Sequence, residues 1–328
     1  MNPVPNAGRS WNRVWPCVAD LVFAYVLLVG FGRDPSSLLS DPDTFWHLRV
    51  GQEIQEIGRV PWSDSLTYTR VGTPWLDQSW AFDWALAELF DRWSWSGVIA
   101  GAVLLLAWLY WGVARWAERL GFSAVTVLAV SVFAFRLGEI HFLARPHLIS
   151  FVLALWMFRA CRAFHDGREW VLWCAPFVMA LWANCHGGFL AGLMILGCSW
   201  LGEAISGTWD RGRLTKLLRL GGIGLLCLGA PLLNPYGVEL YRHVFALLVS
   251  SGLTNLNEEF QPVRFTTLSL GTMELVVLTL IALPTFSRLQ QTRFDLAHAV
   301  AWFHLGMSTI RYTPLFGMAV VPGLGRLI

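Results

Sequence analysis

Apolar stretches recur along the whole chain, and no other feature restricts its fold so strongly. A membrane-spanning helix needs about 20 apolar residues, so several of these stretches are expected to be tilted, broken or re-entrant helices. We predict an all-α, polytopic integral membrane protein with about ten transmembrane helices. The stretches are residues 14–33, 97–116, 121–135, 147–160, 170–183, 188–206, 218–233, 268–285, 296–310 and 312–325.

The composition agrees with a membrane protein. Charged residues make up 14% of the 328 residues and hydrophobic residues 55%, with a mean hydropathy of +0.51, whereas soluble domains carry about 25% charged residues. The formal net charge of +2 gives no sign of nucleic-acid binding. The sequence contains no motif for nucleotide binding, zinc proteolysis or serine hydrolysis. Nucleotide-driven transport and the familiar hydrolase mechanisms therefore receive no support.

The distribution of basic residues predicts the orientation of the helices. With the N-terminus in the cytoplasm, the short inner connections hold most of the arginines and few acids, as the positive-inside rule requires. One transmembrane domain, residues 1–328, then carries two large extracytoplasmic loops, residues 34–95 and 234–267. Arginine greatly outnumbers lysine, which is typical of a GC-rich bacterial genome. We expect a multi-pass protein of the bacterial inner membrane.

Five polar clusters fall on the predicted outer face, whereas the inner connections contain little beyond arginine and ordinary acids. Ionisable groups at a membrane boundary are costly to keep, so they are candidate functional residues. Their convergence predicts that any chemistry is extracytoplasmic. The clusters are Asp41/Asp43/His47, residues 136–147, residues 184–188, residues 234–237 and residues 311–314.

Three segments of the outer loops have the periodicity of amphipathic helices that lie in the membrane interface. In residues 44–57 the apolar and polar side chains fall on opposite faces, and Gly58 with Pro61 is expected to end this helix. Residues 75–90 form a second, aromatic-rich candidate, and residues 237–253 form a third.

Asp41 and Asp43 are the first candidate site residues. On a strand or turn, residues two apart point the same way, which suits a divalent cation with oxygen ligands, such as Mg²⁺ or Mn²⁺. Alternatively, Asp41 starts a turn and Asp43 is the N-cap of the helix 44–57. His47 lies one helical turn after Asp43. It either takes part in the site or is an ordinary interfacial histidine.

The later clusters supply candidates for substrate binding. Arg145, in Arg145-Pro-His147, either clamps a phosphate group with two hydrogen bonds or marks the membrane boundary. His186 is a candidate acid, phosphate donor or interhelical hydrogen-bond partner, and its neighbouring glycines let the backbone approach a ligand. The segment 234–237 is interpreted mainly as a helix stop and turn.

Six motifs link the chain to a known group of proteins: Asp41-x-Asp43-Thr-x-Trp46-His47-Leu-Arg49-x-Gly51, Gly58-x-Val60-Pro61-x-x-Asp64, Arg145-Pro-His147, Asn184-x-His186-Gly-Gly188, Asn234-Pro-Tyr-Gly237 and Arg311-x-x-Pro314-Leu. With an acidic first outer loop and interfacial helices, the chain resembles the C-type-fold membrane glycosyltransferases. It is more closely similar to a group of uncharacterised bacterial membrane proteins usually placed near that superfamily. The resemblance covers nearly the whole chain.

The resemblance implies a glycosyltransferase that moves a sugar from a polyprenyl-phosphate carrier to a lipid or glycan acceptor on the outer face. Asp41 or Asp43 would be the catalytic base or hold the cation. Arg145, with His147, His186 or Arg311, would bind the donor and stabilise charge on the leaving phosphate. The expected partners are the lipid-linked sugar donor, the acceptor and membrane lipids.

Two other functions stay open at this stage. One is a metal-independent polysaccharide ligase that uses arginine and histidine on a lipid diphosphate. The other is a non-catalytic membrane transporter or assembly scaffold, which would place ionisable groups near the bilayer midplane.

Overall fold

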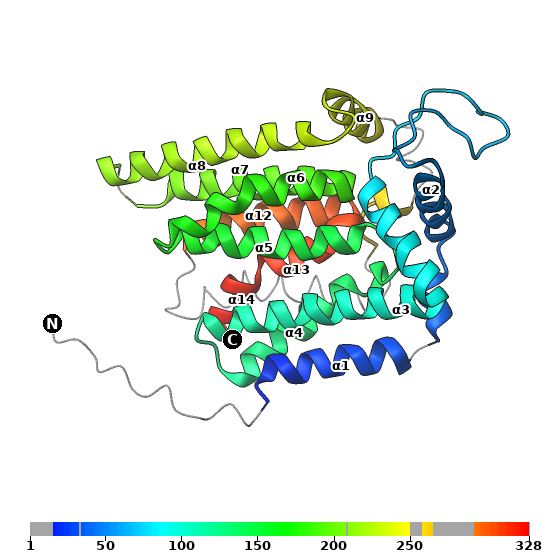
Figure 1. Cartoon of the computed structure of the whole chain (residues 1–328). Helices are drawn as coiled ribbons and strands as arrows, with labels where there is room; N and C mark the ends of the chain where they lie inside the picture. The colour runs from blue at the N-terminus through cyan, green and yellow to red at the C-terminus, as the bar shows by residue number, and fades with distance from the viewer. Residues whose placement is uncertain (1–15, 33, 208, 250–257, 265–291, 328) are drawn as a thin grey trace.

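The computed structural model describes residues 16–32, 34–207, 209–249, 258–264 and 292–327 (Figure 1). This part of the chain is built of helices, and the one β pairing in it is an isolated bridge between Ser63 and Pro74. The all-α prediction is therefore confirmed for the described residues. Their α-helices are α1 Val18–Gly32, α2 Asp43–Ile57, α3 Trp80–Arg119, α4 Ala124–Gly138, α5 His147–His165, α6 Ala175–Cys185, α7 Leu190–Ile205, α8 Arg211–Gly229, α9 Val238–Val249, α12 Arg293–Ser308, α13 Thr313–Ala319 and α14 Val321–Leu327.

Five helical segments among the described residues are long and apolar enough to cross a membrane: Trp80–Arg119, Ala124–His141, His147–His165, Gly187–Ile205 and Arg211–Leu233. They support the prediction of a polytopic membrane protein, but they do not confirm ten spans. The helices α1, α6 and α12 have 15, 11 and 16 residues, which is short for a full span. The predicted stretch 312–325 is divided between α13 and α14, and the stretch 268–285 lies outside the described residues.

The long helices lie side by side with roughly similar directions, and α2 and α9 lie together with the α2–α3 connection at one end of the bundle (Figure 1). We call this the α2 end. The opposite end holds the last residues of α5 and the first of α12, and we call it the α14 end because Arg326 of α14 binds there. The N-terminal residues of α5 therefore lie at the α2 end and its C-terminal residues at the α14 end.

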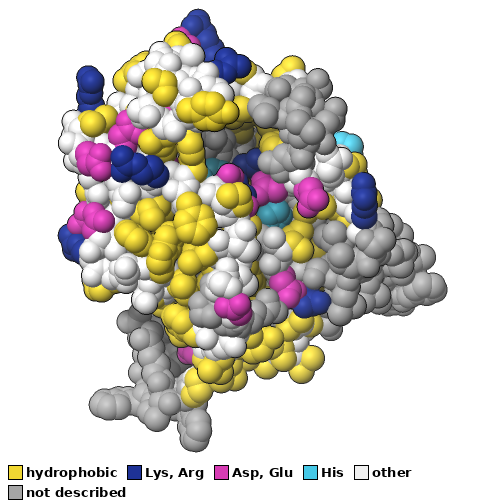
Figure 2. Space-filling model, turned by 90° about the vertical axis from the view of Figure 1, so that its right-hand side faces the viewer, with side chains coloured by type: hydrophobic (Ala, Val, Ile, Leu, Met, Phe, Trp, Pro, Cys, Tyr) yellow, Lys and Arg dark blue, Asp and Glu magenta, His cyan; other side chains and the backbone are white. Residues whose placement is uncertain are grey.

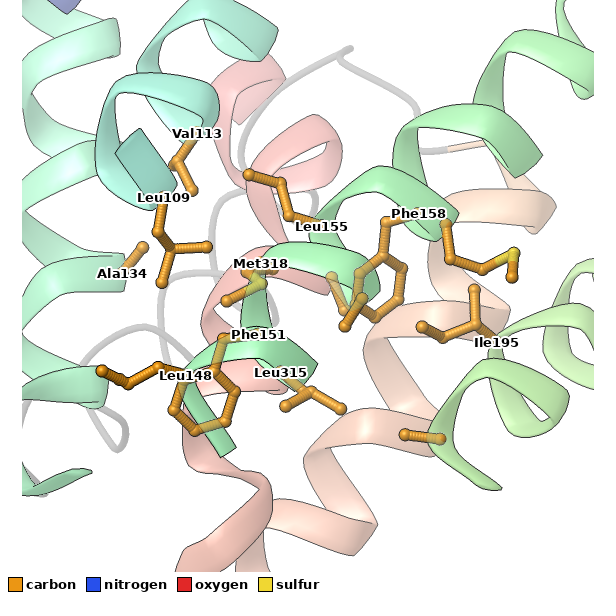
Figure 3. Close-up of a cluster of buried hydrophobic side chains, with 14 of the residues drawn as sticks. Leu109, Val113, Ala134, Leu148, Phe151, Leu155, Phe158, Ile195, Leu315 and Met318 are labelled. Carbon is orange, nitrogen blue, oxygen red and sulfur yellow. The ribbon is translucent and has the colours of Figure 1, made fainter. Parts of the chain in front are cut away.

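The helix α5 lies in the middle of the hydrophobic core. It contacts α3, α6, α7 and α13, and it is the most buried of the candidate spans. Figure 3 shows its side chains Phe151, Leu155 and Phe158 among residues of α3, α7 and α13. Because α5 is fixed along its length, the segment just before it, which carries Arg145, has a fixed position too.

The helix α2 packs closely on α3, and Gly51 makes the close approach possible. A Cβ atom at position 51 would lie 1.9 Å from the backbone oxygen of Asp83, so only glycine fits there. His47 lies one turn earlier on α2 and faces α3 too. The close packing of the helices thus brings His47 against Asp83.

The three helices predicted for the outer loops are found, and their position in a membrane interface stays a prediction. Residues 44–57 lie in α2, which ends at Gly58 in the left-handed conformation, with φ 68°, and the third candidate corresponds to α9. The second candidate, 75–90, corresponds to the first part of α3, which starts at Trp80. The backbone of Ser94 is non-helical, with φ 55° and ψ −155°, so a kink separates this part from the rest of α3.

Candidate functional site at the α2 end

Arg145 connects three segments of the chain through their carboxylates. Its Nη1 atom donates to Asp41 Oδ2 at 2.8 Å and to Glu259 Oε1 at 2.7 Å, and its Nη2 atom donates to Asp43 Oδ2 at 2.7 Å. The backbone N–H of Ala144 also donates to the carbonyl of Leu38 at 2.9 Å, which ties this segment to the start of the first loop. One guanidinium thus faces three carboxylates, so this group of side chains has a surplus of negative charge.

The two aspartates have different roles in the local structure. Asp41 Oδ1 accepts a hydrogen bond of 2.8 Å from the N–H of Asp43, the first residue of α2. The N-cap position is occupied by Pro42, so the interpretation of Asp43 as the N-cap is wrong: the capping carboxylate is that of Asp41. The Asp43 side chain is 56% exposed and that of Asp41 is 23% exposed. Asp43 is the more accessible carboxylate.

A divalent cation does not fit between Asp41 and Asp43 in this arrangement. One oxygen of each carboxylate is taken by the same guanidinium, which lies where a shared cation would have to bind. Among the described residues, no group of three or more His, Cys, Asp or Glu side chains is arranged to hold a metal ion. The Mg²⁺ or Mn²⁺ site therefore stays a prediction, and we derive no chemical step from it.

His186 belongs to a buried hydrogen-bond network that fixes the position of its ring. Trp182 Nε1 donates to Ser150 Oγ at 2.6 Å, and Ser150 Oγ bonds to His186 Nδ1, also at 2.6 Å. The N–H of Gly188 donates to the same Nδ1 at 3.2 Å. Burial, followed by the charge of Arg311, keeps the pKa of His186 well below its usual range, so the imidazole is neutral.

Nη2 of Arg311 bonds to Nε2 of His186 at 3.3 Å. A guanidinium has several N–H donors and no acceptor, so this bond orients Arg311 and leaves its other N–H groups available for an acceptor. The Arg311 guanidinium also lies over the ring of Phe260, at 5.2 Å from its centroid. In the described part of the chain, no carboxylate forms an ion pair with Arg311. His186 and Phe260 thus hold the Arg311 guanidinium in place.

Arg311 lines a cavity of about 350 Å³. Its polar lining includes Asp43, Gln78 and Arg311. Figure 2 shows this end of the molecule, where acidic, basic and histidine side chains gather around a hollow flanked by hydrophobic side chains. The apolar lining comes from α7, α9 and the segment before α12: Leu190, Ala191, Val244, Leu247, Leu248 and Phe260.

A smaller cavity, of about 30 Å³, continues from it past Arg311, Tyr312 and Gly188. His141 and His147 line this smaller cavity, but their side chains already bind the backbone. His147 Nε2 bonds to the carbonyl of His141 at 2.7 Å, and His141 Nε2 to that of Ile310 at 3.1 Å. These bonds join three segments of the chain, and they give His147 a direct structural role.

The predicted turn 234–237 holds the loops of this end together. Asn234 Nδ2 donates to the carbonyl of Ala183 at 3.0 Å, and Gly237 has a φ of 53°, as a turn requires. Tyr236 is buried, and its hydroxyl donates to the carbonyl of Pro61 at 2.8 Å. This agrees with the interpretation of the segment as a helix stop and turn.

Sequence reasoning missed two buried acids, Asp77 and Asp83. They are 4% and 1% exposed, and His47 Nδ1 lies 2.8 Å from Asp83 Oδ1. The angle of that contact is not one of a hydrogen bond, so both atoms lack a hydrogen-bond partner among the described residues. A signal was present in the sequence, because Asp83 is the one acid in the aromatic helical pattern Trp80–Ala87. An acid on such an apolar face is unusual.

Comparison with known proteins finds no matching family model, no matching curated protein and no matching solved structure. Arguments about function therefore depend on the geometry of the α2 end.

Proposed function

We propose that the protein transfers a sugar from a polyprenyl-phosphate carrier to a hydroxyl acceptor on the extracytoplasmic side of a bacterial inner membrane. One observation carries the proposal: the guanidinium of Arg311, which His186 and Phe260 hold in place, lines a cavity whose remaining wall is largely apolar. A guanidinium without a carboxylate partner among the described residues suits a phosphate oxygen. The apolar wall suits the first isoprene units of the carrier.

The electrostatics favour Arg311 over Arg145 as the phosphate contact. Arg145 is bound to three carboxylates, and a phosphate placed on it would be repelled by their surplus negative charge. Among the described residues, the Arg311 guanidinium contacts the imidazole of His186 and the ring of Phe260 and forms no ion pair with a carboxylate. Arg145 is then a positioning residue, which holds Asp41 and Asp43 at a fixed place beside the cavity.

In the proposed reaction, Asp43 is the general base. Arg145 holds its Oδ2 atom, and the carboxylate lines the same cavity as Arg311. The acceptor hydroxyl attacks the anomeric carbon while its proton passes to Asp43. The bond between that carbon and the phosphate oxygen breaks, and the charge released on the phosphate is stabilised by Arg311, which His186 orients. Asp41 caps α2 and orients Asp43.

A metal-independent ligase that acts on a lipid diphosphate is the second candidate. The observation that favours it is that a guanidinium, and not an open space, lies between Asp41 and Asp43. Such a ligase would use the same Arg311 guanidinium and the same base.

Binding of farnesyl phosphate, a short and soluble polyprenyl phosphate, tests the proposal. The purified protein should bind it more tightly than farnesol, and Arg311→Gln should weaken the binding on the order of 10- to 100-fold. Arg242→Gln is the matched control, because Arg242 is exposed and pairs only with Glu239 among the described residues. Equal affinity for farnesol and farnesyl phosphate, or an Arg311→Gln variant with wild-type affinity, would contradict the proposal.

A further inference from the structure

Near the cavity, three titratable side chains from different elements meet in a buried cluster. Asp77 comes from the α2–α3 connection, Asp83 from α3 and His47 from α2. Asp77 and Asp83 are almost fully buried, and their carboxyl groups face each other closely enough to share a hydrogen bond once one of them is protonated. Asp77 Oδ2, both oxygens of Asp83, His47 Nδ1 and the buried Thr44 Oγ1 have no other hydrogen-bond partner in the described part of the chain.

Charge balance decides the state of these acids. Two adjacent carboxylates that are out of contact with water cannot both be ionised unless a cation compensates them. Arg145 acts on His47, but it is bound to Asp41, Asp43 and Glu259. Tyr236, Cys185 and His186 also interact with the group. None of them supplies a positive charge, because tyrosine and cysteine are neutral or anionic and burial holds the pKa of His186 low.

We propose that His47, Asp77 and Asp83 form a proton-binding site whose occupancy controls the binding of the anionic donor in the neighbouring cavity. The proposal rests on the donor-binding role assigned to that cavity. With the proton bound, the two acids carry one negative charge between them, because His47 is neutral. When the proton is lost they carry two, and the added charge beside the cavity repels a phosphate.

The backbone provides a direct connection between the two sites. Gln78 follows Asp77 and lines the cavity. A Cβ atom on Gly187 would lie 2.3 Å from Gln78 Oε1, so this side chain packs tightly against the loop that follows His186. The Asp77 N–H donates to the Tyr236 hydroxyl, and Asp77 Oδ1 accepts from the Ser79 N–H. A charge on Asp77 therefore acts on the segment that forms the cavity wall.

The titration range of the group lies near neutral pH. Burial, and next the nearby Asp83 carboxylate, raise the pKa of Asp77 to about 8. Burial lowers the pKa of His47 to about 4, so its imidazole is neutral in this range. The proton should therefore be bound at pH 7 and lost as the pH passes about 8.

Infrared titration of the purified protein with ¹³C-carboxyl-labelled aspartate tests the proton itself. We expect a carbonyl band from a protonated aspartic acid at pH 7, which decreases as the pH rises through about 8 and is reduced in Asp77→Asn. Asp34→Asn is the control, because hydrogen bonds from Ser36 lower the pKa of Asp34 and keep it ionised. A wild-type protein without the band, or a band unchanged in both Asp77→Asn and Asp83→Asn, would overturn the proposal.

Binding of farnesyl phosphate on either side of pH 8 tests the coupling. Wild-type affinity should fall on the order of tenfold across this range, as one added charge at partial burial predicts, and Asp77→Asn should keep its affinity. An equal fall in both proteins would overturn the coupling. If the wild type binds no farnesyl phosphate at any pH, the proposed function fails and the coupling fails with it, whereas the infrared band still decides whether the proton-binding site exists.

Discussion

The two ends of the helix bundle both bury charged side chains, but they pair them differently. At the α14 end, Asp295 accepts one hydrogen bond from Arg162 on Oδ1, at 2.5 Å, and another from Arg326 on Oδ2, at 2.6 Å. In the same region, Glu203 Oε2 lies 2.6 Å from His165 Nδ1. At the α2 end, the carboxylates outnumber the cations that bind them, and the oxygens of Asp83 lack partners.

This difference separates a structural role from a functional one. A buried acid whose oxygens are both occupied by arginine contributes to holding helices together, and it has no capacity left for a ligand. A buried acid without such partners costs free energy and is retained where a site needs it. We therefore assign the α14 end to the stability of the fold and the α2 end to binding and chemistry.

Asp295→Ala gives the strongest test of whether the α14 end stabilises the fold. This change leaves Arg162, which is 9% exposed, without its buried partner, and we expect a loss of about 3–5 kcal/mol in the free energy of unfolding. Unfolding in mixed micelles measures it. Glu239→Ala removes an exposed ion pair and should cost about 0–1 kcal/mol. If Asp295→Ala cost as little as this control, the α14 end would not be the structural end.

Gly51→Ala tests how closely the α2 end is packed. The added Cβ would meet the backbone oxygen of Asp83, so α2 must move, and we expect a loss of about 1–3 kcal/mol together with weaker farnesyl phosphate binding. Gly222→Ala, in α8, meets nothing within 4 Å and should instead gain about 0.5–1 kcal/mol. Equal effects of the two changes would show that α2 is not packed on α3 as described.

The pH dependence of stability should also differ between the variants. The pKa of Asp77 is raised from 3.8 to about 8, so the unfolded chain releases this proton first and the free energy of unfolding falls as the pH rises. His47 acts in the opposite direction, but only below 6.5. Between 6.5 and about 8, stability should therefore fall less steeply in Asp77→Asn than in the wild type. Identical slopes of unfolding free energy against pH in the two proteins would show that Asp77 does not have a raised pKa.

The sequence was informative where a local pattern decides the structure. The periodicity of residues 44–57 predicted α2, and Gly58 marked its end, because both depend on neighbours along the chain. The apolar stretches predicted a helical membrane protein, but not which of them would be short, broken or fused, since packing in the bundle decides that.

The site was predicted in part. The sequence indicated Asp41, Asp43, His186 and Arg311 as candidates, but the pairing of Arg145 with residues 41 and 43 arises only when distant segments meet. Asp77 and Asp83 were missed because they lie within an aromatic segment that was interpreted as an interfacial helix. Their burial follows from the packing of α2 on α3, which no local pattern reveals.

Sugar transfer by purified variants tests the central claim, that the α2 end carries the chemistry. Wild type, Asp43→Asn and Asp166→Asn would be incubated with radiolabelled polyprenyl-phosphate sugars, and the release of polyprenyl phosphate would be measured. Asp166 is the matched control, because it pairs with Arg162 at the α14 end. We expect Asp43→Asn to fold normally and to lose on the order of 10²- to 10⁴-fold in rate, with Asp166→Asn at the wild-type rate. Equal rates for the two variants, or no transfer by the wild type from a broad panel of sugars, would contradict the account.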